Sequence, residues 1–180
     1  MSSLYDLTPG TWTVDPSHST IGFVARHLMV SKVRGHFATF SGTVTIAGDP
    51  YDSKVEATVD IASVTTGDDT RDGHLKSADF FDLEKYPNMT LVSTGIEKDG
   101  SGYVLHSDLT INGITKPVDF ELEFNGVGAD PWGGTRAGFS AEADVNRKDW
   151  GLEWNVALEA GGVLVGDKVK IQLEIEAIKS

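Results

Sequence analysis

The sequence predicts an all-β protein: a single antiparallel β-barrel of about eight strands with one short helical insertion. Three observations support this fold class. Apolar and polar residues alternate with a period of two through most of the chain. Clusters of turn-forming residues separate the alternating segments. One charged segment, Thr66–Asp82, departs from this alternation and carries apolar residues at helical spacing.

The clearest predicted strand is Lys54–Ile61, in which apolar side chains occupy every second position. Because successive side chains of a strand point to opposite faces, this pattern gives one dry face and one wet face. Residues 118–124, 137–145 and 169–175 follow the same pattern. Less regular strands are predicted at Thr11–Asp15, Ser19–His27, Val33–Ala47, Met89–Glu97 and Tyr103–Ile111.

The connections between these strands indicate tight reversals. The stretches GDPYDS, EKDGSG, NGITKP and GADPWGG contain the Gly, Pro, Asn and Asp residues that such turns require. Neighbouring strands are therefore expected to run antiparallel. About eight strands with one apolar face each must hide those faces in a sandwich or a barrel, and a barrel also removes the exposed strand edges. We therefore favour the barrel.

The charged segment is predicted to hold a short helix that covers the mouth of the barrel. Asp69 or Thr70 is the expected N-cap, and Gly73 limits the length of the helix. Asp72 and Lys76 are expected on the solvent side as an ion pair four residues apart. The opposite side is predicted to carry Arg71, His74, Leu75, Ala78 and Phe81.

Composition excludes several classes of function. The 180 residues suit one domain, and no internal boundary divides residues 1–180. The net charge of −12 opposes binding to nucleic acids and to anionic lipid headgroups. The absence of cysteine rules out disulfides and thiolate chemistry. The N-terminus shows neither a signal peptide nor a membrane anchor, so we expect a cytoplasmic protein without an integral membrane segment.

The five histidines do not predict a metal site, because none has the paired spacing of metal ligands on a helix. His18 is expected to start a strand, and His106 to be solvated. Arg71 and His74 are expected to hydrogen-bond backbone carbonyls where the helical insertion meets the strand ends. No nucleophile accompanies them. We therefore predict no catalytic residue, no metal and no cofactor.

Five motifs, in order along the chain, resemble those of the YceI-like family, also called polyisoprenoid-binding-like proteins. They are DPSHSTIGFVARHLMVSKVRGHF, TRDGHLKSADFFD followed by YPNMTLVST, DLTINGITKPV, GFSAEADVNRKDWG and VGDKVKIQLEIEA. The resemblance covers nearly the whole chain. It implies a lipocalin-like barrel whose interior holds a long-chain isoprenoid or similar amphiphile, and a helical insertion that helps to close the barrel. Many members of the family carry a signal peptide, which this sequence does not show.

Together these observations predict a carrier or storage protein for a polyisoprenoid, an isoprenoid quinone or a similar lipid. The residues predicted to bind it are Phe23, Phe37, Phe40, Phe80, Phe81, Leu91, Leu109, Phe120 and Phe139. Two alternatives stay open. One is an enzyme that acts on an apolar substrate, with His74, His27 or Arg71 as acid or base. The other is a barrel without a physiological ligand. The sequence does not decide between a monomer and a homodimer.

Overall fold

Antiparallel strands form nearly all of the regular structure. The computed structural model describes residues 3–28, 30–155 and 165–180. The strands are β1 (Gly10–Val14), β2 (Thr20–His27), β3 (Ser31–Phe37), β4 (Phe40–Ile46), β5 (Lys54–Asp60), β6 (Val64–Thr65), β7 (Asn88–Asp99), β8 (Gly102–Ile111), β9 (Ile114–Ala129), β10 (Thr135–Asn146) and β11 (Val165–Lys179). The helices are α1 (Asp69–Lys76) and the short 3₁₀ turns η1 (Leu4–Asp6), η2 (Pro16–His18), η3 (Pro50–Asp52), η4 (Ile61–Ser63) and η5 (Arg147–Trp150).

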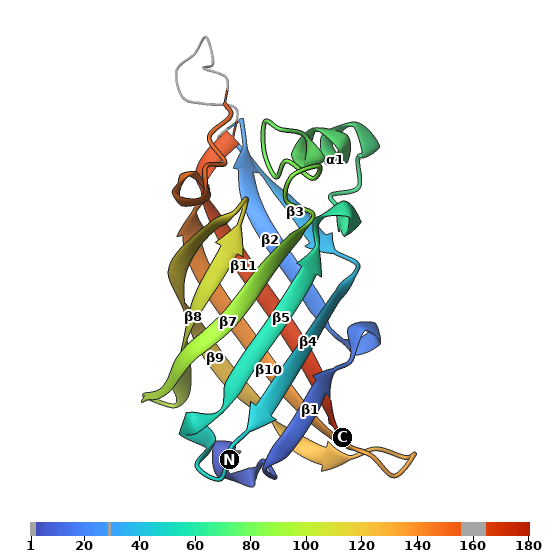
Figure 1. Cartoon of the computed structure of the whole chain (residues 1–180), viewed down its shortest axis with the longest axis vertical. Helices are drawn as coiled ribbons and strands as arrows, with labels where there is room; N and C mark the ends of the chain where they lie inside the picture. Colours follow the sequence, from blue (N-terminus) through green and yellow to red (C-terminus); the bar gives the residue numbers. More distant parts are fainter. Residues whose placement is uncertain (1–2, 29, 156–164) are drawn as a thin grey trace.

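The strands close into a barrel (Figure 1). The closed ring runs β1-β4-β5-β7-β8-β9-β10-β11, and β1 pairs with β11 to complete it. Near one end of the barrel, β2 takes the place of β1 beside β11, and β3 and β6 continue the sheet from β2. The predicted eight-stranded antiparallel barrel with one helical insertion is confirmed.

One segment that was predicted as a single continuous strand is interrupted in the structure. The segment Val33–Ala47 contains two strands, β3 and β4, which are separated at Ala38 and Thr39. The amide of Ala38 donates to the carbonyl of Ser63 at 3.2 Å, and Thr39 accepts from the amide of Asp60 at 3.0 Å. These bonds cross the break, so the wall bends there without leaving its backbone groups unpaired.

The predicted alternation of dry and wet faces is present in the barrel wall. Along β8 every second residue is buried, from Tyr103 to Ile111. Phe120 on β9 is only 1% exposed. In one place the wall depends on a glycine, because a Cβ atom added to Gly35 would lie 2.3 Å from the ring of Phe23. The ring can therefore lie flat against β3.

The two ends of the barrel are covered by different elements. At one end η1 brings Leu4 and Leu7 into the core. At the other end α1 lies above the strand ends (Figure 1). No helix in the described parts of the chain combines the length and apolar character needed to span a bilayer.

Helix α1 differs from the prediction in two details. It begins after Asp68, whose carboxylate accepts from the amide of Arg71 at 3.1 Å, so the N-cap lies one residue before the first of the two predicted positions. The helix ends at Lys76, and Ala78 and Phe81 therefore lie in the turns that follow it.

Candidate ligand-binding cavity

The interior of the barrel contains a cavity of about 630 Å³. This volume lies within the range of about 300–1,000 Å³ that is typical of sites for small molecules. Inward-facing side chains of the ring strands form its wall, and most of them are aliphatic or aromatic. At the η1 end, Leu4 and Leu7 form the floor. The arrangement can hold an apolar molecule away from water.

The residues predicted to bind the ligand all lie on this cavity wall. They are Phe23, Phe37, Phe40, Phe80, Phe81, Leu91, Leu109, Phe120 and Phe139. Several of them pack against one another: the ring centroids of Phe23 and Phe37 lie 5.7 Å apart, and those of Phe37 and Phe81 lie 6.0 Å apart. The inward direction of these side chains is thus established, whereas their contact with a ligand stays a prediction.

Basic side chains of the cavity lining gather at its α1 end. Arg71, His74, His27 and Arg147 all contribute to the lining there. Arg71 was predicted to bond a carbonyl near a strand end, and it does so: Nη2 donates to the carbonyl of Thr66 at 2.8 Å, just after β6. Its Nε donates to the Thr66 hydroxyl at 2.7 Å.

The predictions for His74 and Asp72 are wrong. The Nε2 atom of His74 lies 2.9 Å from the carboxylate of Asp79 rather than next to a carbonyl. Asp72 is buried instead of forming a surface ion pair with Lys76. Its carboxylate accepts from both the amide and the hydroxyl of Thr66, at 2.9 and 2.6 Å. Helical spacing could not show that the preceding loop folds back over this face.

The segment 66–86, which we call the lid, is joined to the barrel mainly through aromatic side chains. The ring of His74 meets that of Trp154 edge-on at 4.5 Å, and Phe80 lies 5.5 Å from Trp154. Phe81 contacts Phe37 on β3. Phe80 and Phe81 therefore lie between the lid and the barrel, and their role at an entrance stays a prediction.

Sequence reasoning missed Arg147, which is buried beside the cavity. Its guanidinium donates to the carbonyls of Trp154 and Gly166 at 3.0 and 2.9 Å, and also to the carbonyl of Leu152. Burial lowers the pKa of Arg147. The sequence did contain a signal for this position: Arg147 follows the inward-facing Val145 by two residues, and side chains two apart on a strand point to the same face. Through these bonds Arg147 joins residues 152–154, which follow β10, to the start of β11. Arg147 therefore stabilises this rim of the barrel.

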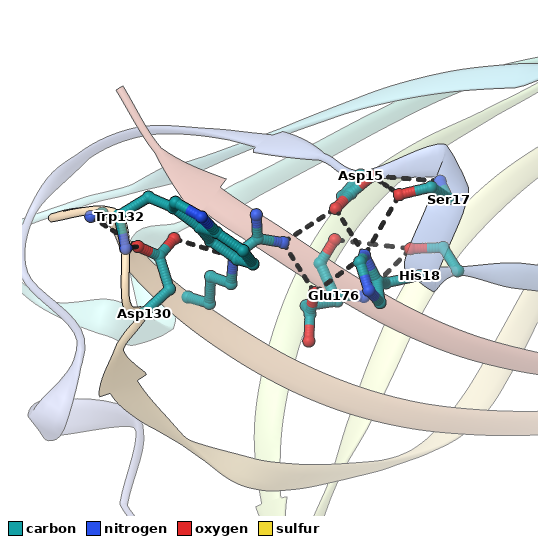
Figure 2. A network of polar contacts seen from close by, with 9 residues as sticks. Asp15, Ser17, His18, Asp130, Trp132 and Glu176 are labelled. Atoms are coloured by element: carbon teal, nitrogen blue, oxygen red, sulfur yellow. Dashed lines mark hydrogen bonds and ion pairs between the residues drawn. The ribbon is translucent and has the colours of Figure 1, made fainter.

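A second polar network lies on the barrel wall, away from α1, where β1, β10 and β11 meet (Figure 2). The Nη1 atom of Arg136 donates to the carboxylates of Asp15 and Glu176, both at 2.7 Å. Its Nε donates to Asp130 at 2.9 Å. The bond with Arg136 is the main cause that holds the pKa of Asp15 well below its usual range. None of these residues lines the cavity.

His18 belongs to the same network. Ligand-type atoms of Asp15, His18 and Glu176 come within 4.8 Å of one another, a grouping that the sequence did not predict. Arg136 already binds both carboxylates there, so they are engaged without a metal ion. Ser17 and Asp15 both contact Nδ1 of His18. A serine–histidine relay needs the two ring nitrogens separately, so this geometry does not form one. The network braces the junction of β1 and β2.

The comparisons with known proteins agree with this architecture. The sequence profile of the YceI-like domain matches residues 12–177. Protein YceI of Escherichia coli is 44% identical over 137 residues, which cover 76% of this chain and 72% of that protein.

Two solved structures share the fold. BcnA of Burkholderia cenocepacia has a TM-score of 0.77 and 24% identity, and the match covers 91% of this chain and 98% of BcnA. A polyisoprenoid binding domain from Saccharophagus degradans has a TM-score of 0.73 and 17% identity, with coverage of 96% and 100%.

Proposed function

This chain belongs to the YceI-like family, and we propose that it binds one long apolar or amphiphilic molecule inside its barrel and stores or carries it. The observation that carries the proposal is the cavity of about 630 Å³ with its predominantly apolar wall. We propose a polyisoprenoid, an isoprenoid quinone or a similar lipid as the cargo. The description of the S. degradans neighbour as a polyisoprenoid binding domain supports this class.

The energetics favour such a cargo. Burial of a long isoprenoid chain removes several hundred square ångströms of apolar surface from water, worth on the order of 10 kcal/mol before ordering costs. Few polar contacts are needed for binding of this kind. Phe23, Phe120 and Phe139 would contact the chain from different strands of the wall.

We propose binding rather than catalysis for the polar groups at the mouth. Arg71 is engaged with Thr66, His74 with Asp79, and Arg147 with backbone carbonyls. Each of these bonds shapes the lid or the rim. His27 also lines the cavity, and the hydroxyl of its cross-strand partner Ser31 donates to the His27 carbonyl rather than to the imidazole ring.

Titration with geranylgeraniol, an isoprenoid alcohol, tests the proposal. Trp150 and Trp154 line the cavity, so occupancy should change the tryptophan fluorescence. Native mass spectrometry should show one bound molecule per chain. Phe139→Ala should weaken binding, whereas Glu142→Ala on the outer face of the same strand should not. Absence of a bound alcohol, together with absence of any lipid in solvent extracts of the purified protein, would contradict the proposal.

The same preparation separates binding from catalysis. A carrier releases its extracted cargo chemically unchanged after long incubation, and His74→Gln should give the same extract as the wild type. A cargo that the wild type converts and His74→Gln does not would show that the cavity is an active site.

A further inference from the structure

The basic residues of this acidic protein are unevenly distributed. Residues 16–48 contain no Asp or Glu, although these two types make up 27 of the 180 residues. The same stretch contains Arg26, Lys32 and Arg34. The net charge of −12 therefore does not describe this part of the surface. All three residues belong to the hairpin formed by β2 and β3.

The three basic side chains are exposed on the hairpin. Arg26 and Lys32 are direct cross-strand partners, an arrangement of like charges that destabilises a sheet. In the part of the chain that the structure describes, no carboxylate lies within 4.0 Å of their charged nitrogens or of those of Arg34. On the neighbouring strand β11, by contrast, Lys168 pairs with Asp144 and Lys170 with Glu142. The stability of the fold does not account for the unpaired cluster.

The tip of the same hairpin exposes apolar side chains. Leu28 is 40% exposed and Val30 is 80% exposed. Leu28 also has a φ of 56°, in the left-handed region that leucine rarely adopts. The turn between β8 and β9 meets a similar backbone requirement with Asn112 and Gly113, the residues suited to it. The β2–β3 tip thus presents apolar side chains where polar turn residues would fit the backbone better.

The hairpin lies at the α1 end of the barrel (Figure 1). Its inward-facing residues Ala25, His27 and Val33 line the cavity. The exposed tip is therefore continuous with the wall of the proposed cargo site. A surface that meets the tip lies close to the entrance of the cavity.

We propose that the β2–β3 hairpin docks this protein on anionic lipid bilayers. Leu28 and Val30 enter the interfacial layer, while Arg26, Lys32 and Arg34 contact lipid phosphates. Docking brings the cavity mouth to the membrane, where an apolar cargo is exchanged; this purpose rests on the proposed function, whereas the docking itself does not. Positive charges on an edge strand also prevent sheet-to-sheet pairing, but an exposed apolar tip would have the opposite effect.

The excess of acidic residues elsewhere does not prevent such docking. At physiological ionic strength the Debye length is about 8 Å, so charges farther than this from the lipid surface are largely screened. The local cluster then determines the electrostatic contribution. Each Lys or Arg near an anionic surface contributes about 1 kcal/mol, or roughly fivefold in binding.

Flotation with vesicles tests the proposal. The wild type should bind vesicles of phosphatidylcholine with one third phosphatidylglycerol more strongly than pure phosphatidylcholine vesicles, and salt should weaken this binding. Arg26→Gln/Lys32→Gln/Arg34→Gln should reduce the binding on the order of 100-fold. Leu28→Ser/Val30→Ser should reduce it on both kinds of vesicle.

Matched controls lie at the other end of the barrel. Lys54 begins β5, while Lys98 and Lys179 lie at the far ends of β7 and β11 (Figure 1). Lys54→Gln/Lys98→Gln/Lys179→Gln changes the net charge by the same amount and should bind vesicles like the wild type. Trp132→Ser removes another side chain that is 80% exposed, on the β9–β10 turn, and should likewise have no effect.

The outcomes separate the docking from the cargo proposal. Equal binding to both vesicle types, or equal loss in the hairpin and control variants, would overturn the docking surface. That result would indicate that the basic cluster binds an acidic protein instead of a lipid bilayer. Geranylgeraniol binding, measured without vesicles, should be unchanged in Leu28→Ser/Val30→Ser, because neither position lines the cavity. If the wild type binds anionic vesicles through the hairpin but binds no geranylgeraniol, the docking surface stands and the cargo proposal fails.

Discussion

The η1 side of the barrel and the lid are fastened in opposite ways. On the η1 side, polar bonds join residues far apart in the chain: Arg136 to Asp15 and Glu176, and Ser19 to Glu176. The amide of Leu4 also donates to the hydroxyl of Tyr103. At the α1 end, the hydrogen bonds of the lid, among the residues described, all join partners within the segment 66–86.

This difference indicates which end opens. Movement of the η1 end would break bonds that hold distant strands together. Movement of the lid would separate aromatic contacts, such as Phe81 with Phe37 and His74 with Trp154, and would leave its internal bonds intact. The lid can therefore move as a unit, and we expect cargo to enter there, while the η1 end keeps the barrel closed.

The largest loss of stability is expected from a charge placed in the dry interior of the barrel, on which both ends pack. Phe120→Asp would place an unpaired carboxylate at a site that is 1% exposed, at a cost of about 4 kcal/mol or more. The variant should unfold or lose its cargo in thermal and native mass measurements. Glu121→Ala, on the outer face of the same strand, should stay within about 0.5 kcal/mol of the wild type. A stable Phe120→Asp that still binds geranylgeraniol would show that the interior tolerates charge.

A change at the closed end should reduce stability without affecting exchange. Trp12 on β1 is 1% exposed and does not line the cavity, and its replacement by alanine should cost about 3–5 kcal/mol. Urea unfolding should show this loss. The rate of geranylgeraniol release should change little, because the lid is untouched. Faster release without a loss of stability would place the entrance at the η1 end instead.

A change in the lid should give the reverse result. Phe81→Ala removes one partly buried aromatic ring at the entrance, and binding should weaken by about 1–3 kcal/mol with little loss of global stability. Titration and urea unfolding of the same sample provide both values. Trp12→Ala and Phe81→Ala thus form a reciprocal pair. The comparison fails if both variants change the same quantity, either the free energy of unfolding or the affinity for geranylgeraniol.

The sequence predicted those parts of the fold that depend on local periodicity. Alternation along β5, β8 and β9 identified the inward side chains, including Phe120 and Leu109, because a buried face restricts each strand to one register. The helical insertion was found from its charge and spacing. The break at Ala38 was not found, because the bond that compensates for it comes from Ser63 in a different element.

The polar parts of the molecule were predicted less well, for the same reason. The partners of Asp72 and His74 depend on how the lid folds on itself, and those of Arg147 on a loop that passes around it. Arg136 binds a carboxylate 121 positions away in the chain. Spacing within one segment carries no information about such partners.

The smallest effect is expected from titration of the closed end, because its ion pairs lie partly in solvent and are weakened by screening. The pKa values of both Asp15 and Asp130 are lowered in the folded state. The main cause is the bond with Arg136 for Asp15, and for Asp130 the bond from the Gly134 amide, followed by that with Arg136. A lowered carboxyl pKa contributes stability that is fully present above the unfolded value of about 3.9 and is lost as the pH falls below it. The melting temperature should therefore decrease in acid below about pH 4.

Arg136→Met should lower the melting temperature at neutral pH and make its acid dependence shallower. Lys170→Met, which removes an exposed pair with Glu142, is the matched control and should preserve the wild-type slope. An identical slope in Arg136→Met would mean that the network does not fasten this end, and that the apolar floor of Leu4 and Leu7 closes it alone.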